Sequence, residues 1–200
     1  MGVKRQATTA SAEDQYGTLE RAGDASVLRY RRRLSHPQEK VWRALTEDVH
    51  LAGWFPTTIE GDRVAGAPLH FSIRQAEAAP FYGEMLAFDP PSVMELRWAD
   101  DVLRFELSPD AGGCVLDLTV TFPEYGKAAR DAAGWHVCLE QLGHVVEEAA
   151  LPWDPPDRWR AVHREYVQRL GPEAATIGPP EVSDRTRGTA DADVDVDGDQ

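Results

Sequence analysis

The chain has 200 residues, of which 42% are hydrophobic and 28% are charged, a composition typical of one globular domain with flanking segments. No apolar run approaches the roughly 18 residues that a membrane-spanning helix needs. The first residues, 1–6, show neither the apolar region of a signal peptide nor a myristoylation motif. We therefore expect a cytoplasmic protein that has no membrane as a partner.

The formal net charge is −13, from 34 acidic and 21 basic residues. An acidic chain repels phosphate backbones, so we expect no nucleic-acid partner. Nearly half of the excess negative charge lies in residues 172–200, which form a polar, strongly acidic tail. We expect this tail and residues 1–24 to lack regular structure. Between them, residues 25–151 form the predicted domain and residues 152–171 a predicted C-terminal helical extension.

Two cysteines, Cys114 and Cys138, are too few for a disulfide framework, and we interpret both as small buried hydrophobic residues. The sequence contains neither a Gly-rich phosphate loop nor a Gly-x-Ser-x-Gly nucleophile motif. No cofactor is therefore predicted.

Residues 27–34 alternate in polarity and predict the first strand, one face of which carries Leu28, Tyr30 and Leu34 but also Arg32. A helix follows at once. Ser35 has the side chain of an N-cap, and Gln38, three residues later, predicts a capping box. Gly53 marks the expected end of this helical segment.

Four further runs alternate in the same way and are separated by turns rich in Pro, Gly and Asp. They predict antiparallel strands at Leu69–Arg74, Met94–Trp98, Leu103–Leu107 and Cys114–Phe122. Each strand has one apolar face, and a sheet of this kind must be covered on that face by helices.

A long helix is predicted over residues 128–150, with a core-facing stripe formed by Trp135, Leu139, Leu142, Val146 and Ala149. A shorter amphipathic helix follows, with one apolar face made of Trp159, Val162, Tyr166 and Leu170. This face is a candidate contact for a homodimer or another protein partner. The element order predicts an α+β fold in which a long helix lies across an antiparallel sheet.

Four local patterns then resemble a known family. They are Glu39–Thr46 leading to Trp54–Pro56, Gly83–Pro91 leading to Leu96–Trp98, Leu103–Leu107, and Gly134–Leu142. Together they resemble the START-like SRPBCC superfamily, and within it the bacterial homologues of the activator of the ninety-kilodalton heat-shock-protein ATPase. The resemblance implies a helix-grip (START-like, Bet v-like) fold, in which a curved sheet wraps a long C-terminal helix around an apolar cavity.

The implied occupant of this cavity is a small apolar or aromatic molecule. Mapped onto this sequence, the expected ligand-binding residues are Trp54, Phe55, Phe71, Met85, Leu96, Trp98, Phe105, Leu116, Leu118, Trp135, Cys138, Leu139 and Leu142. The alternative is that these side chains fill a solid core, as aromatic residues at such spacings commonly do.

Few ionisable groups are expected to face the cavity, which favours binding over catalysis. The weak candidates are Tyr82 and Glu84, which face inward only if their strand directs its even positions that way, together with Arg32 and His50. A buried Glu84 could act as the acid or base of a cyclase.

The long helix carries His136, Glu140 and His144 at intervals of four residues. Such spacing can hold a metal ion, but we expect these side chains to form a solvated face and predict no metal. His163 is expected to pack beside its helix, and His36 to lie in a turn.

Three functions remain open from the sequence. The first is a binding protein for a small hydrophobic ligand. The second is a polyketide cyclase or aromatase-like enzyme that uses Glu84 and Tyr82. The third is a co-chaperone that stimulates a heat-shock ATPase, as the resemblance suggests, although this fold hosts many unrelated activities.

Overall fold

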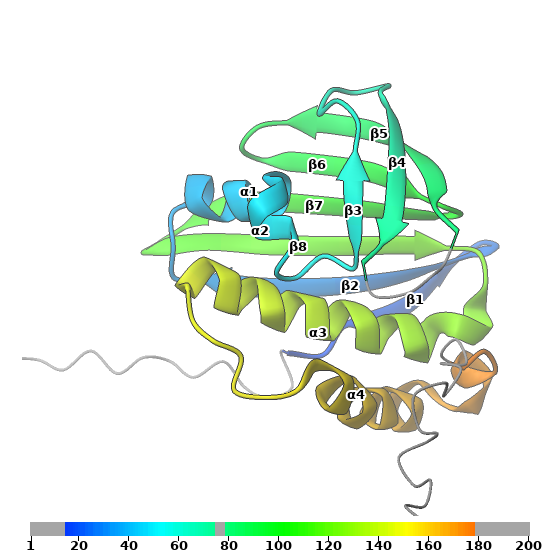
Figure 1. Ribbon diagram of the computed structural model, residues 1–200. Coiled ribbons are helices and arrows are strands. Elements are labelled where there is room, and N and C mark those ends of the chain that lie inside the picture. Colours follow the sequence, from blue (N-terminus) through cyan, green and yellow to red (C-terminus); the bar gives the residue numbers. More distant parts are fainter. Residues whose placement is uncertain (1–14, 75–78, 179–200) are drawn as a thin grey trace, which may run out of the picture.

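The alternating polarity of the sequence is realised in eight strands that form one antiparallel sheet (Figure 1). The computed structural model describes residues 15–74 and 79–178. Its strands are β1 (Thr18–Ala22), β2 (Ala25–Leu34), β3 (Thr57–Glu60), β4 (Pro68–Ile73), β5 (Phe81–Asp89), β6 (Val93–Trp98), β7 (Asp101–Asp110) and β8 (Gly113–Phe122).

The strand order in the sheet is β1-β2-β8-β7-β6-β5-β4-β3, so every neighbouring pair except β2 and β8 is consecutive in the chain. The register pairs Leu28 with Val120 and Phe105 with Leu118, which places their side chains on the same buried face. A register shift interrupts the β5–β6 ladder between Met85 and Ala87, and an irregularity of this kind bends the strand.

Both ends of the described chain are more ordered than the sequence analysis expected. The prediction that residues 1–24 lack regular structure is wrong for Thr18–Ala22, which pairs along β2. Likewise η3 (Pro172–Ala175) forms a 3₁₀ helix within the predicted tail, residues 172–200, and buries Ala174. Most of the remainder of both predicted tails lies outside the described residues.

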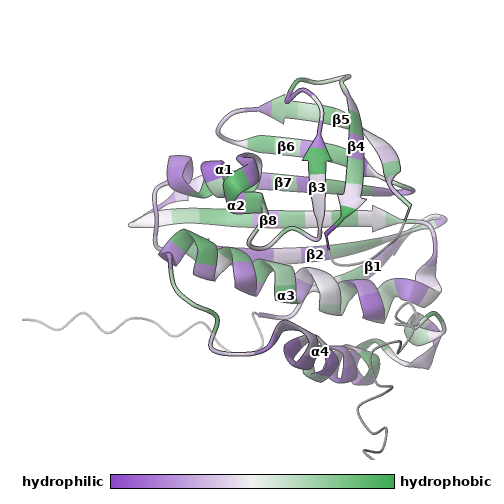
Figure 2. Cartoon of the chain, in the orientation of Figure 1, coloured by the Kyte–Doolittle hydropathy of each residue, from purple (hydrophilic) through white to green (hydrophobic). Residues whose placement is uncertain are grey.

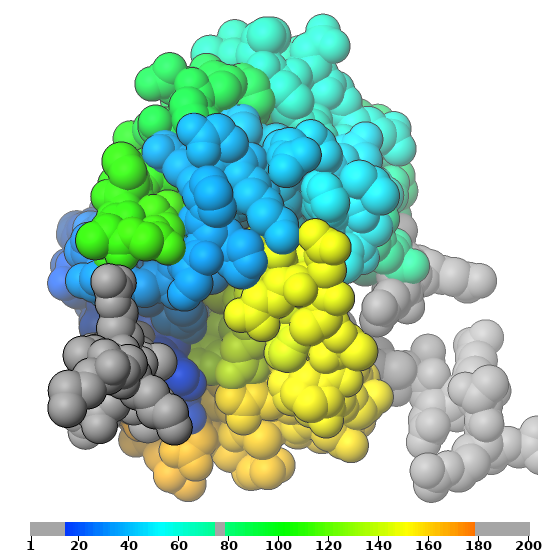
Figure 3. All heavy atoms as spheres, turned by 90° about the vertical axis from the view of Figure 1, so that its left-hand side faces the viewer, coloured from blue at the N-terminus to red at the C-terminus, as the bar shows by residue number. Residues whose placement is uncertain are grey.

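The first helical segment divides into α1 (Gln38–Thr46) and α2 (Asp48–Leu51), and it lies beside the C-terminal part of the long helix that follows the sheet (Figure 3). The predicted capping box is wrong, because the N-cap position is Pro37 and no side chain caps the helix. The Gln38 amide instead donates to the carbonyls of Pro91 and Leu107, each at 3.1 Å. Gln38 thus fastens the start of α1 to the sheet.

The long helix α3 (Ala128–Glu147) follows a short 3₁₀ turn, η2 (Tyr125–Lys127), and lies across the sheet as predicted (Figure 1). It ends earlier than expected, because Glu148 adopts a left-handed conformation at its C-cap. Ala149 is consequently exposed and does not continue the apolar stripe. This arrangement is the expected α+β helix-grip fold.

The second long helix, α4 (Pro155–Leu170), packs on the side of α3 that faces away from the sheet (Figure 1). Its apolar face buries Val162 and Tyr166 against the rest of the chain, while its remaining surface is largely hydrophilic (Figure 2). The stripe proposed as a partner contact therefore has an intramolecular partner, α3. No helix among the described residues is both long enough and apolar enough to cross a membrane.

Candidate functional site

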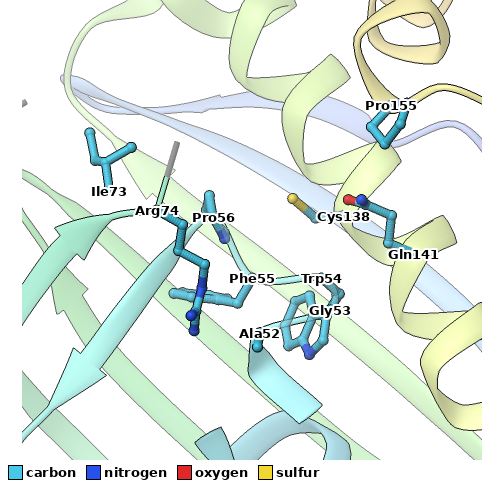
Figure 4. Close-up of a pocket in the computed structure, with 10 residues that line it drawn as sticks. All are labelled: Ala52, Gly53, Trp54, Phe55, Pro56, Ile73, Arg74, Cys138, Gln141 and Pro155. Atoms are coloured by element: carbon cyan, nitrogen blue, oxygen red, sulfur yellow. The ribbon is translucent and has the colours of Figure 1, made fainter. Parts of the chain in front are cut away.

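A half-open cleft lies between the segment that follows α2, the end of β4 and the middle of α3, beside the start of α4 (Figure 4). Its volume is about 280 Å³, close to the lower end of the range for small-molecule sites. It is lined by Ala52, Gly53, Trp54, Phe55, Pro56, Ile73, Arg74, Cys138, Gln141 and Pro155.

Two aromatic residues form a fixed apolar wall of this cleft. Trp54 Nε1 donates to the carbonyl of Ala44 at 2.9 Å, and the Trp54 and Phe55 rings meet edge to face with centroids 5.3 Å apart. Phe55 also contacts Trp135 of α3, at 5.8 Å between centroids. Because every ring is held by a neighbour, the wall exists before any ligand arrives.

The backbone at Gly53, which precedes Trp54 and Phe55, lies close to α3, and the absence of a side chain at Gly53 allows this close approach. A Cβ at Gly53 would lie 2.6 Å from a methyl group of Val145, which is closer than non-bonded carbons can pack. The Gly53 N–H bonds to the carbonyl of His50 at 3.0 Å, and the N–H of Phe55 bonds to that of Leu51 at 2.9 Å. These bonds turn the chain so that Trp54 and Phe55 enter the core side.

Cys138 contributes a thiol to the α3 side of the cleft. Burial raises the pKa of this thiol to about 12, and burial also raises the pKa of Cys114, which lies in the core. Both thiols are therefore protonated at neutral pH, and the thiolate is the nucleophile in alkylation.

We expect the native protein to resist iodoacetamide at neutral pH, because neither Cys114 nor Cys138 supplies a thiolate. Intact-mass spectrometry should show the unmodified chain before unfolding and two added groups after unfolding in denaturant. Rapid modification of the native protein at Cys138 would contradict this assignment of a protonated thiol.

Of the predicted ligand-binding residues, only Trp54, Phe55 and Cys138 line the cleft. A side chain that borders a cavity large enough for water keeps accessible surface there, whereas Phe71, Met85, Leu96, Phe105 and Leu118 expose 0%. The structure places these five in the packed core. Leu116, Trp135, Leu139 and Leu142 are also buried, and Trp98 packs against the same core.

The weak catalytic candidates are not brought together in the cleft. Met85 of β5 is fully buried, so the odd positions of this part of the strand face inward and the even ones outward. Tyr82 is 74% exposed, and Glu84 is paired in register with the exposed Arg97 of β6. The condition under which Glu84 could serve a cyclase is therefore not met.

The other two inward candidates also lie elsewhere. Arg32 donates to the carbonyl of Gln15 at 2.6 Å, and burial lowers the pKa of its guanidinium. His50 lies 3.4 Å from Glu47 and remains 40% exposed. Neither residue lines the cleft described above.

A buried polar cluster between α3 and α4 was missed by the sequence analysis. His136, expected on a solvated face, is 1% exposed, because α4 covers that face of α3. Its Nδ1 lies 3.2 Å from the Tyr166 hydroxyl and its Nε2 lies 3.2 Å from Glu140 Oε1. A proton on Nε2 lets that nitrogen donate to Glu140, while Nδ1 remains within hydrogen-bond distance of the Tyr166 hydroxyl.

Glu140 is the charged centre of this cluster. Burial alone would raise the pKa of Glu140, but hydrogen bonds from Arg158 and His136 outweigh burial and lower the pKa to about 2. Arg158 Nε donates to Glu140 Oε2 at 2.8 Å. The paired groups belong to α3 and α4, so the cluster fastens one helix to the other.

The remaining histidines do not assemble a metal centre in the described part of the chain, where no group of three or more His, Cys, Asp and Glu side chains is placed to hold an ion. His144 packs edge to face on Trp153, with centroids 6.1 Å apart. His163 stacks on Trp159 at 4.7 Å, and burial lowers its pKa.

Solved structures resemble this fold over most of their own length. The conserved protein EF2215 from Enterococcus faecalis is 21% identical, with 77% of this chain and 90% of that chain covered and a TM-score of 0.65. The protein encoded by gene BPP1335 from Bordetella parapertussis is 28% identical, with 72% and 86% covered and a TM-score of 0.60.

An AHSA1-like protein from Aeromonas hydrophila is 19% identical, with 61% of this chain and 92% of that chain covered and a TM-score of 0.52. No curated protein sequence matches the chain. The family model described as "Activator of Hsp90 ATPase homolog 1-like protein" matches residues 35–147, from the turn before α1 to the end of α3. Since that match spans more than half of the sequence, the chain belongs to this family of the START-like SRPBCC superfamily.

Proposed function

We propose that this protein binds a small hydrophobic molecule in the cleft bordered by Trp54, Phe55 and Cys138. The observation that carries the proposal is the half-open cleft itself, whose walls are predominantly apolar. Rings fixed by Ala44 and Trp135 form one wall, and a site that is already formed spends little free energy on ordering when it binds. The cytoplasmic location that the sequence predicts stays a prediction.

The two other functions have less support. A cyclase would need Tyr82 and Glu84 to face a substrate in the cleft. Tyr82 is exposed instead, and Glu84 faces away from the buried side of β5. The co-chaperone reading rests on the family match, whose description names an ATPase activator. It predicts that the protein raises the ATPase rate of the cognate heat-shock chaperone, and an unchanged rate in a coupled assay would argue against it.

A neutral aromatic probe, 2-naphthamide, tests the binding proposal. We expect one molecule per chain by isothermal titration calorimetry, and native mass spectrometry of the purified protein should show any small molecule that co-purifies. Cys138→Phe places a ring in the cleft from α3 and should weaken binding by about tenfold or more.

The matched control is Gly143→Phe, which adds the same ring to the same helix where a new Cβ meets no neighbouring atom within 4 Å. Gly143 does not line the cleft, so this variant should bind like the unmodified protein. Equal losses in both variants would mean that the probe binds elsewhere. If 2-naphthamide does not bind and nothing co-purifies, the proposal fails.

A further inference from the structure

The cleft has a pronounced charge asymmetry. Among its ten lining residues, Arg74 is the only one that is charged, and Gln141 is the only other with a polar side chain apart from the Trp54 indole and the Cys138 thiol. Figure 4 shows the Arg74 side chain on one side of the cleft, with Gln141 and Pro155 across from it. A molecule in the cleft therefore has apolar walls around it and a cation and an amide at its edges.

Several features keep Arg74 available to a ligand. In the described part of the chain, no carboxylate oxygen lies within 4.0 Å of its guanidinium, whereas four arginines of the sheet have such a partner: Arg29, Arg31, Arg33 and Arg104. Its backbone N–H bonds to the carbonyl of Pro56 at 3.5 Å, which extends the β3–β4 pairing and holds the residue beside the cleft. The side chain itself is exposed.

Two acids directly precede lining residues in the sequence, and both are already engaged. Glu140 precedes Gln141 and accepts from Arg158 Nε at 2.8 Å. Asp154 precedes Pro155 and caps α4, where its carboxylate accepts the N–H of Asp157 at 3.1 Å. The positive end of the α4 dipole partly balances the charge of Asp154. Among the residues that line the cleft, Arg74 therefore carries the only formal charge.

We infer that the cleft selects a hydrophobic carboxylate, whose apolar body lies against Trp54 and Phe55 and whose anionic group pairs with Arg74. The inference rests on the proposed function and adds the chemical class of the ligand. A guanidinium presents a planar fork of donors that matches a carboxylate. The apolar walls provide the affinity and the charge provides the selectivity.

The overall charge of the chain makes this inference testable. At a net charge of −13, the long-range field repels anions and attracts cations. A preference for an anionic probe must therefore arise from groups close to the cleft, because a preference caused by the net charge would have the opposite sign.

Three probes that share a naphthalene ring and differ in charge test whether the cleft prefers an anion: 2-naphthoate, 2-naphthamide and 2-naphthylmethylammonium. By calorimetry at low salt we expect 2-naphthoate to bind about fivefold to tenfold more tightly than the amide, and the ammonium probe to bind most weakly. The preference should shrink as salt is added, because Arg74 is exposed to solvent.

Arg74→Gln should remove the preference for the carboxylate while leaving the affinity for 2-naphthamide unchanged. Arg97→Gln is the matched control, since it removes the same charge from an exposed position on β6 and should keep the preference. Equal affinities for the acid and the amide, or a preference that survives Arg74→Gln, would overturn the inference while the proposed function stands. If none of the probes binds, the proposed function fails together with it.

Discussion

Replacing Trp135 with alanine is expected to lower the free energy of unfolding by about 3–5 kcal/mol. Trp135 lies where α3 meets the sheet, and its ring is surrounded by Phe55, Trp98 and Phe105 at centroid distances of 5.8, 5.7 and 6.5 Å. Removing it leaves a cavity that these rings cannot fill without losing their own contacts. The loss should appear in urea unfolding as a lower midpoint at an unchanged slope.

Trp159→Ala is the matched control, because it makes the same change on α4 at a half-buried residue whose ring stacks on His163. It removes less buried surface, so we expect a clearly smaller loss than for Trp135. Similar losses in the two variants would contradict the inference that Trp135 buries more of its surface than Trp159 does. A domain is commonly stable by only about 5–15 kcal/mol, so the Trp135 variant should also lose probe binding at temperatures where the unmodified protein binds.

The sheet and its long helix were predictable because their signals are local and periodic. In β7, Leu103, Phe105 and Leu107 alternate with polar residues and are buried as expected. The edge strand β1 has no such signal, since four of its five residues are exposed and only Leu19 is partly buried. It forms because its backbone pairs with β2, and backbone pairing of an edge strand leaves no periodic pattern of polarity in the sequence.

The candidate site was only partly predictable, for a different physical reason. The periodicity of a single helix predicts one buried face. The helix α3 is covered by the sheet on one side and by α4 on the other, so His136 is buried on the face that was expected to be exposed to solvent. Similarly, whether Phe71 or Phe55 borders a cleft depends on how rings from separate elements meet, as the stacking of Phe71 on Phe81 shows. The spacing of apolar residues in the sequence predicts which face of a helix or strand is buried. Whether a cleft remains beside that face depends on how the side chains of separate elements pack together.

Replacing Glu140 with glutamine is expected to destabilise the protein, because the Glu140 carboxylate is the charged centre of the cluster between α3 and α4. This carboxylate has a folded-state pKa of about 2 against an ordinary value of 4.5. Because the folded-state pKa is the lower one, the stabilisation is fully present above about pH 4.5 and is lost as the pH falls toward 2. A difference of this size corresponds to about 3 kcal/mol, at about 1.4 kcal/mol per pKa unit.

At neutral pH we therefore expect Glu140→Gln to lower the free energy of unfolding by about 2–3 kcal/mol, since Arg158 and His136 lose their charged partner. Urea titrations of both proteins at a series of pH values give the difference between them. This difference should be constant above about pH 4.5 and should shrink toward zero near pH 2.

Glu147→Gln removes the same charge from an exposed position near the end of α3, and we expect its effect to stay within about 0.5 kcal/mol at every pH. Acidic residues that do not contact Glu140 titrate in both proteins and cancel in the comparison, so the change in the difference below about pH 4.5 reports on Glu140. A difference that is the same at pH 7 and near pH 2 would mean that the Glu140 carboxylate does not stabilise α4 through its charge. The contact between α3 and α4 would then depend on the apolar packing of Val162 and Tyr166 alone.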